Sequence, residues 1–264
     1  MDKAGNIVLS KPYRLSFMKE FCKLAKLATN KQRANLAKLT GSAFGDSPST
    51  LTNHIKYLRQ GAVGQLFWDK PWKQVVTDVA DQIDIDWETT LNGRRWKNLP
   101  TQDIENAVVA KLFQDMLDKI SPEQRDKIIM EMQRNSDDPR LEALLASGGA
   151  MTAAQMSGFG VYLMASTVLG GLTNAIGITL PFAVYMGMSQ TISFVIGPVG
   201  WAALAGGILY SLNQPNWNRL TLSVVYISVI RASLKDSEEI KKAEIAKAQQ
   251  DRIVFWMARG IEVK

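Results

Sequence analysis

One stretch of the chain constrains its fold more than any other: residues 143–218 contain no Asp, Glu, Lys, Arg or His. A helix on the surface of a soluble protein keeps charges on its wet face. This stretch must therefore lie inside the protein, lie inside a bilayer, or be able to do both. All 31 basic and 25 acidic side chains, and the single histidine, lie in the remainder of the 264 residues.

The bulk composition excludes a disordered chain, because 46% of the residues are hydrophobic and 8% are aromatic. The length is enough for one large domain or two small ones with a real core. The one cysteine, Cys22, excludes a disulfide framework and suits a reducing compartment. The first residues, 1–12, lack the apolar segment of a secretory signal. We therefore expect cytoplasmic synthesis and residence.

The positive charge of the chain is concentrated near its start. Residues 1–40 hold nine Lys and Arg against Asp2 and Glu20, a net charge of +7. Such a segment favours a polyanionic partner, either nucleic acid or an anionic lipid surface.

A helix is predicted from Pro12 to Thr29, with an apolar and a basic face. Its apolar positions recur at spacings of 4, 3 and 4: Phe17, Phe21, Leu24 and Ala28. The basic face supplies the candidate membrane- or partner-binding residues Lys19, Lys23 and Lys26. The pattern fits an interfacial helix. It also fits the commoner case, a surface helix packed on its own domain.

Further helices are predicted through the charged middle of the chain. One covers about 50–66, a second opens at Lys70-Pro71-Trp72, and a third follows Thr101 as its N-cap. The sequence Ser121-Pro122-Glu123-Gln124 is a strong start signal for a helix that runs to about Arg134. The middle contains no convincing alternating strand pattern.

The uncharged region is rich in small residues, with twelve of the nineteen glycines. Pro181 and Pro198 divide it into segments 151–179, 180–196 and 198–213, the last two of which could form a hairpin. Small residues suit close packing in a membrane and equally in a soluble core. Constitutive membrane residence, a buried hairpin that engages lipid, and a purely soluble core all stay open. The hairpin contributes four candidate contact residues: Gly197, Pro198, Gly200 and Trp201.

The end of the chain combines an apolar and a charged segment. Residues 220–230 are almost continuously apolar, as in a buried helix or strand, and are followed by Arg231. A long charged helix with Lys/Glu pairs is predicted from Lys235 to Arg259.

The chain contains no nucleotide-binding, metalloprotease, hydrolase or paired-cysteine motif. A pairing of Cys22 with His54 would lack a third group to orient it. An acidic run raises a metal hypothesis, but a solvated helix face is the favoured interpretation: Asp78, Asp81, Asp84, Asp86 and Glu88. We therefore expect a protein that is not an enzyme, with no catalytic residue, cofactor or metal.

Four tryptophans alternate with cations between residues 68 and 97: Trp68, Trp72, Trp87 and Trp96. Such clusters can stack on bases or lie at a headgroup interface. A tryptophan-rich core with basic residues outside is the favoured interpretation. No helix-turn-helix or RNA-binding signature accompanies the cluster, so nucleic acid is not the expected partner.

Several segments resemble the YaaW family of bacterial proteins, in the same order, over roughly residues 55–232. They are QGAVG at 60–64, VVTDVAD at 75–81, LDKISPEQ at 117–124, IGPVGWA at 196–202, NRLT at 218–221 and the segment 225–231. The Gly-Pro-Val-Gly-Trp box at 197–201 is the most specific of them. Some members of this family resemble the sensor of a two-protein defence system against jumbo phages, the jumbo phage killer system.

This resemblance implies a cytoplasmic, non-enzymatic sensor. It would recognise the lipid-bounded compartment that such phages make early in infection, assemble there, and recruit a lipid-acting partner. The implied partners are a phage-derived membrane compartment or anionic lipid and a second defence protein encoded nearby. A homo-oligomer stays open.

We therefore predict an all-α, multi-helix bundle with a glycine-rich apolar hairpin in its core. Its parts would be a basic amphipathic segment (1–46), a charged helical subdomain (47–142), an apolar core (143–234) and a charged C-terminal helix (235–264). An anti-phage membrane sensor is the first hypothesis. The alternatives are a pore-forming or membrane-damaging effector with an insertable hairpin, and an assembly chaperone for a membrane respiratory complex.

Overall fold

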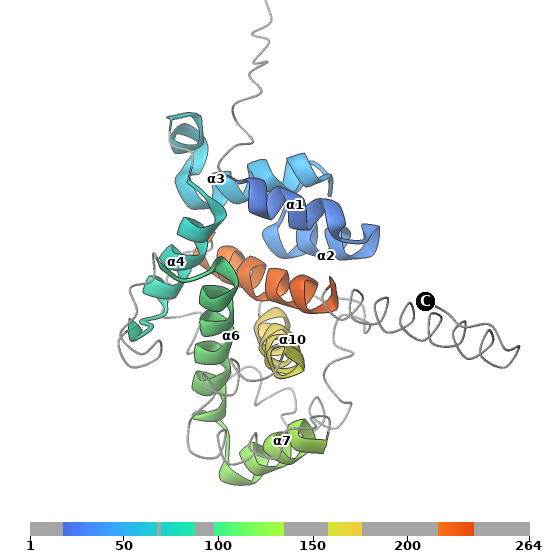
Figure 1. Cartoon of the computed structure of the whole chain (residues 1–264), viewed down its shortest axis with the longest axis vertical. Coiled ribbons are helices and arrows are strands. Elements are labelled where there is room, and N and C mark those ends of the chain that lie inside the picture. Colours follow the sequence, from blue (N-terminus) through green and yellow to red (C-terminus); the bar gives the residue numbers. More distant parts are fainter. Residues whose placement is uncertain (1–17, 68–69, 88–97, 135–157, 176–215, 235–264) are drawn as a thin grey trace, which may run out of the picture.

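The computed structural model describes residues 18–67, 70–87, 98–134, 158–175 and 216–234, and every regular element in these ranges is a helix (Figure 1). The helices are α1 (Lys19–Leu27), α2 (Asn30–Thr40), α3 (Pro48–Phe67), α4 (Trp72–Gln82), α6 (Thr101–Leu117), α7 (Pro122–Arg134), α10 (Gly158–Ala175) and a helix over 216–234. The all-α prediction is confirmed.

The helix over 216–234 lies at the centre of the fold. In Figure 1 it runs between α1 and α2 on one side and α6 and α10 on the other. All residues from 220 to 230 are buried. A helix covered on every side has no need for a polar face, and its sequence becomes continuously apolar. This explains why the apolar run 220–230 fitted a strand equally well, and the structure shows that it is a helix that continues past Arg231.

The described part of the uncharged region also lies in this core. Helix α10 packs against α6, and its six consecutive residues 164–169 are buried, which is more than a full turn. One of its hydroxyls bonds to its own backbone, since Thr173 Oγ1 donates to the Leu169 carbonyl at 2.7 Å. None of the helices in the described ranges is long and apolar enough to cross a membrane. The segments 180–196 and 198–213 and the C-terminal helix lie outside the described residues.

The prediction of one helix over 12–29 is wrong at its end, and its first residues, 12–17, lie outside the described residues. Helix α1 begins at Lys19, and Ala28 is already extended, with ψ 143°. Thr29 then caps a second helix, α2, which the periodicity did not predict. Its hydroxyl accepts from the Gln32 backbone N–H at 3.2 Å, and Gln32 Oε1 accepts from the Thr29 N–H at 2.8 Å. This capping box turns the chain from α1 into α2.

Of the predicted N-caps of two further helices, α7 and α6, only the first is confirmed. Ser121 caps α7 as predicted, since Gln124 N–H donates to its hydroxyl at 3.3 Å and Gln124 Oε1 accepts from its N–H at 3.2 Å. The prediction of Thr101 as the N-cap of α6 is wrong, because Pro100 occupies that position and Thr101 is the first helical residue. The Thr101 hydroxyl instead donates to Glu20 Oε2 on α1 at 2.8 Å.

One core connects all these helices. Buried side chains from α1, α4, α6, α10 and the 216–234 helix form a single cluster, in which the largest are Trp72, Tyr226, Phe21 and Phe113. The Phe21 and Trp72 rings lie 5.0 Å apart at 49°, a tilted contact typical of aromatic pairs. The predicted four-part division of the chain stays a prediction.

Candidate functional site

Helix α1 has the two faces that its sequence predicts. Phe21 and Leu24 are buried against the core, whereas Lys19, Lys23 and Lys26 are exposed. The buried positions face α3 and α4, which pack on this helix. The three lysines are therefore held in solvent by the burial of the opposite face.

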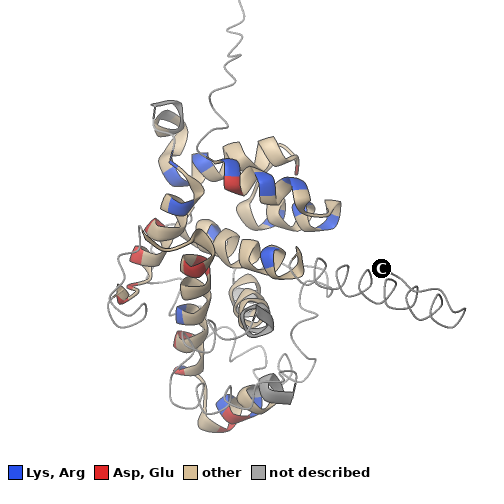
Figure 2. Cartoon of the chain, viewed as in Figure 1, with Lys and Arg blue, Asp and Glu red and all other residues tan. Residues whose placement is uncertain are grey.

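Helix α2 extends this exposed positive charge. Lys31 in its first turn and Lys38 in its last turn are both exposed. A cation in the last turn of a helix is favourable because the C-terminal end of the helix dipole is negative. We call the five exposed lysines of the two helices the basic surface: Lys19, Lys23, Lys26, Lys31 and Lys38. Figure 2 shows the concentration of Lys and Arg over α1 and α2.

The charge of the whole chain is concentrated in the unit that carries this surface. Residues 18–67 hold eight Lys and Arg and two acids, so their net charge of +6 equals that of the entire chain. Like charges gathered in this way create a positive potential that attracts anions.

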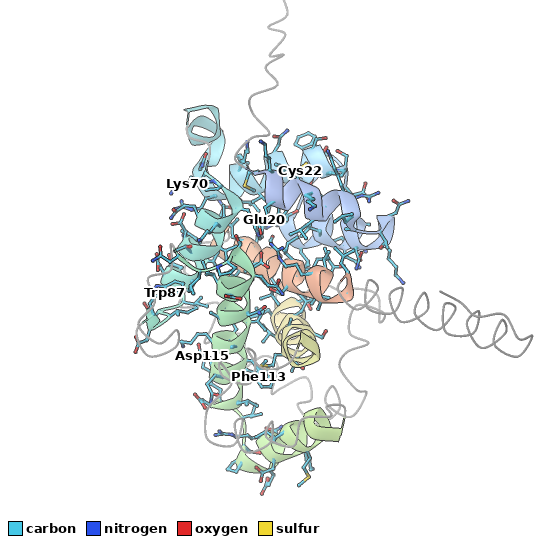
Figure 3. All side chains as sticks on the ribbon, viewed as in Figure 1. Glu20, Cys22, Lys70, Trp87, Phe113 and Asp115 are labelled. Carbon is cyan, nitrogen blue, oxygen red and sulfur yellow. The ribbon has the colours of Figure 1, made fainter. Side chains whose placement is uncertain are left out.

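The one carboxylate on α1, Glu20, is 40% exposed and bonds to residues of two other helices. Glu20 Oε1 lies 2.5 Å from Arg231 Nη2 on the 216–234 helix, and Glu20 Oε2 accepts from Thr101. Figure 3 shows Glu20 between α1 and that helix. Because Glu20 bonds to Arg231 and Thr101, its charge is engaged by these partners, and the five lysines of the basic surface stay exposed.

Arg231 holds a second, fully buried carboxylate. Its Nε donates to Glu105 Oε2 on α6 at 2.6 Å, and its Nη2 donates to Glu105 Oε1 at 3.1 Å. Trp72 Nε1 on α4 donates to Glu105 Oε1 at 2.6 Å. We call Glu20, Arg231, Glu105 and Trp72 the buried network. It joins α1, α4, α6 and the 216–234 helix at one point.

Burial raises the pKa of the Glu105 carboxyl above its ordinary value of 4.5, and the charge of Arg231 and the hydrogen bonds from Arg231 and Trp72 offset part of the rise. For Arg231, burial alone would lower the pKa, but Glu105 and Glu20 raise the pKa above its ordinary value. A tightly bonded, largely buried pair of this kind is typical of structural ion pairs. The network therefore connects α1, which carries three lysines of the basic surface, to the core of the protein.

One member of the acidic run, Asp78 on α4, is engaged by cations. Arg59 Nη2 lies 2.6 Å from Asp78 Oδ2, Lys70 Nζ lies 3.3 Å from the same oxygen, and Gln74 donates to Asp78 Oδ1 at 2.9 Å. The Arg59 guanidinium also lies 5.0 Å from the centre of the Trp217 ring. Within the described ranges, no group of three or more His, Cys, Asp or Glu side chains could hold a metal ion.

The structure gives separate surroundings to Cys22 and His54. Cys22 is buried on α1, and His54 Nε2 lies 2.9 Å from the Thr40 carbonyl oxygen at the end of α2. Among the predicted tryptophans, Trp72 is buried and Trp87 packs partly buried against the core, as the core interpretation predicts. Trp68, Trp96 and the hairpin candidates Gly197, Pro198, Gly200 and Trp201 lie outside the described residues.

Sequence reasoning missed the buried network. A signal was present, since Glu105 lies next to Ile104 and one turn before the apolar pair Val108 and Val109. Arg231 likewise follows an apolar run. A lone charge at an interior position indicates a buried partner, but the pattern does not say which.

Comparison with known proteins gives one distant similarity. The chain is 24% identical over 174 residues to a "UPF0174 protein" of Helicobacter pylori, and the match covers 65% of each chain, slightly less than two thirds. No family model matches the sequence. No solved structure matches it either.

Proposed function

We propose that this chain is a non-enzymatic anti-phage defence protein that binds a lipid-bounded structure formed early in phage infection, assembles on it and recruits a membrane-acting partner. The basic surface carries the membrane-binding part of the proposal. The choice of a phage-derived compartment as the target rests on the resemblance to the YaaW family.

The basic surface has the charge and the rigidity that a contact with anionic lipid needs. Each cation near an anionic bilayer contributes on the order of 1 kcal/mol, so five exposed lysines together are enough for reversible recruitment. Their positions are fixed by the burial of Phe21 and Leu24 behind them. Because such attraction is electrostatic, it should weaken strongly near 1 M salt, where the Debye length is about 3 Å.

A membrane-damaging effector is the second candidate, and α10 is the observation that favours it. This helix has no charged side chain, and its residues 164–169 are buried on all sides. It could exchange protein neighbours for lipid without carrying a charge into the bilayer.

The first experiment is flotation of the purified full chain with dye-loaded vesicles of anionic or neutral lipid, with binding and leakage followed in the same tube. Binding to the anionic vesicles with dye retained supports the sensor. Binding with dye release supports the effector. A chain that floats with neither kind of vesicle contradicts both.

A pair of double charge reversals tests the site. Lys23→Glu with Lys26→Glu should weaken binding by about 30-fold or more, because two attractions of about 1 kcal/mol are lost and two repulsions added. Lys119→Glu with Lys127→Glu is the matched control, since both lysines are exposed and lie outside the basic surface. Equal losses in the two variants would mean that net charge and not the α1–α2 surface drives binding. In cells, unchanged sensitivity of a deletion strain to jumbo phages would contradict the defence role.

A further inference from the structure

The turn between α2 and α3 holds a phenylalanine in solvent. Phe44 is 87% exposed, although the turn around it is well fastened. Gly41 and Gly45 on either side adopt φ of 71° and 101°, conformations that favour glycine. The Ser42 N–H donates to the Ala37 carbonyl at 2.9 Å, and the Ser42 hydroxyl donates to the Gly45 carbonyl at 3.0 Å. The conformation of the turn, held by these hydrogen bonds and glycines, therefore keeps Phe44 exposed.

Arg219 fastens this turn from below. Its Nη1 donates to the Thr40 carbonyl at 2.8 Å. A Cβ added at Gly41 would lie 1.0 Å from the same nitrogen, so a side chain there would displace the guanidinium, and the φ of 71° also favours glycine. The turn is thus tied to the 216–234 helix, and Phe44 projects from a fixed base.

Beside Phe44 lies a surface cavity of about 460 Å³, lined by Phe44, Thr50, Asn53, His54 and Tyr57. The four residues from α3 are spaced along one face of that helix. The His54 and Tyr57 rings stack 5.8 Å apart at 27°, and Tyr57 is 43% exposed. Aromatic rings with polar tips, mixed with hydroxyl and amide groups, suit the boundary between water and lipid headgroups.

Two exposed lysines precede this aromatic patch on α2, and one acid, Asp46, lies in the turn. Lys31 and Lys38 lie two turns apart on the exposed side of α2, which leads directly into the turn. Between Glu20 and Asp69 the sequence has seven Lys and Arg and a single acid, Asp46. A protein surface that is apolar at its tip and cationic at its base complements an anionic bilayer.

The exposed apolar side chains also lie mostly on the positively charged part of the molecule. Four large hydrophobic residues are exposed in the described ranges: Leu27, Phe44, Tyr57 and Met130. The first three lie on the α1–α3 unit, which carries the net positive charge, and Met130 lies on α7. Apolar exposure and positive charge are thus concentrated in one part of the molecule.

We infer that the turn over residues 41–47 is an interfacial anchor, which inserts the Phe44 ring among the headgroups and upper acyl chains of an anionic bilayer while Lys38 remains at the phosphate level. The inference rests on the proposed membrane binding and names the part of the protein that enters the lipid. The anchor adds an apolar contribution that persists when salt weakens the attraction of the lysines, because burial of an aromatic ring is not screened by ions.

The test measures the position of the turn and the affinity separately. In a chain with Cys22→Ala, a polarity-sensitive fluorophore is attached to Phe44→Cys or, as control, to Met130→Cys. On anionic vesicles that carry a lipid-borne quencher, the label at 44 should shift to the blue and be quenched, and the label at 130 should stay as in water. In the otherwise native chain, Phe44→Ser should lower binding about 10-fold and Met130→Ser should leave it unchanged.

The outcomes separate this inference from the proposed function. A chain that floats while the label at 44 stays in water, or whose Phe44→Ser variant binds like the wild type, overturns the anchor and leaves membrane binding intact. A chain that does not float overturns both. A Phe44→Ser variant that dissociates an oligomer in sedimentation, with vesicle binding unchanged, assigns the patch to a second copy of the chain and overturns the lipid anchor.

Discussion

The α1–α2 unit and the buried helices α10 and 216–234 place their polar groups in opposite ways. In the unit, the lysines are outside and uncompensated, and apolar residues such as Phe21 are inside. In the buried helices the sequence is nearly free of charge: of the two arginines, Arg219 bonds to the Thr40 carbonyl and Arg231 to two carboxylates. A long uncharged sequence therefore does not by itself indicate a membrane span, since full burial between other helices produces the same composition.

The largest expected loss of stability comes from removing Arg231, the cation that pairs with the buried carboxylate of Glu105. Arg231→Met should lower the free energy of unfolding by about 3–5 kcal/mol, because it leaves Glu105, which is 0% exposed, without its cation. Lys111→Met is the control: it removes the half-exposed Lys111–Asp115 pair on α6, at 2.5 Å, and should cost less than about 1 kcal/mol. Urea denaturation followed by circular dichroism measures both. Similar losses would show that burial does not distinguish the two pairs.

The next effect compares two leucines, one from each region. Leu169→Ala on α10 should cost about 2–5 kcal/mol, because Leu169 is 0% exposed and its loss leaves a cavity. Leu27→Ala on α1 should change stability by less than about 0.5 kcal/mol, because this side chain is 54% exposed. A small loss for Leu169→Ala would contradict the packing of α10 against α6.

A pH series isolates the contribution of Glu105. Its pKa is raised in the folded state, so between pH 4.5 and that raised pKa the native chain binds more protons than the unfolded chain. The contribution of Glu105 to stability is therefore fully present below pH 4.5 and is lost as the pH rises through the folded pKa. Relative to Glu105→Gln, the wild type should become less stable over this window, as measured by urea denaturation at each pH. Parallel curves for the two chains would contradict the raised pKa.

The elements that the sequence predicts best are those with a clear period. The inward positions of α4 are buried as predicted: Val75, Val76, Val79 and Ile83. Helix α2 was missed because its sequence, NKQRANLAKLT, has few apolar residues to form a period. Its signal was the capping pair of Thr29 and Gln32, three residues apart. Local chemistry at a helix end thus carries information that periodicity lacks.

The buried network could not be predicted from local sequence patterns, because its contacts join residues far apart in the chain. Arg231 bonds to Glu105, which is 126 residues away, and to Glu20, which is 211 residues away. Contacts at such separations depend on how the helices pack, and a helical period specifies only which side of each helix is inward. The candidate lysines of α1 needed no such information, because exposure follows directly from the amphipathic pattern.

The smallest expected loss of stability comes from removing the capping hydroxyl of α2 or of α7. Comparing the two variants tests whether the two regions unfold together. Thr29→Ala on α2 and Ser121→Ala on α7 each remove a capping hydroxyl and should each cost about 1 kcal/mol. Side chains fasten α2 to the 216–234 helix, since Gln32 Nε2 donates to Ser233 Oγ at 3.1 Å and Asn35 Nδ2 donates to the Tyr226 hydroxyl at 3.2 Å.

Because of these bonds, we expect both capping variants to shift one common unfolding transition by similar amounts. Hydrogen exchange read together with urea denaturation makes the measurement. If Thr29→Ala accelerates exchange only in α1 and α2 and leaves the main transition in place, the α1–α2 unit opens independently of the core. In that case the basic surface could leave the buried helices while the rest of the protein stays folded, and the contrast between the two regions would extend from their composition to their stability.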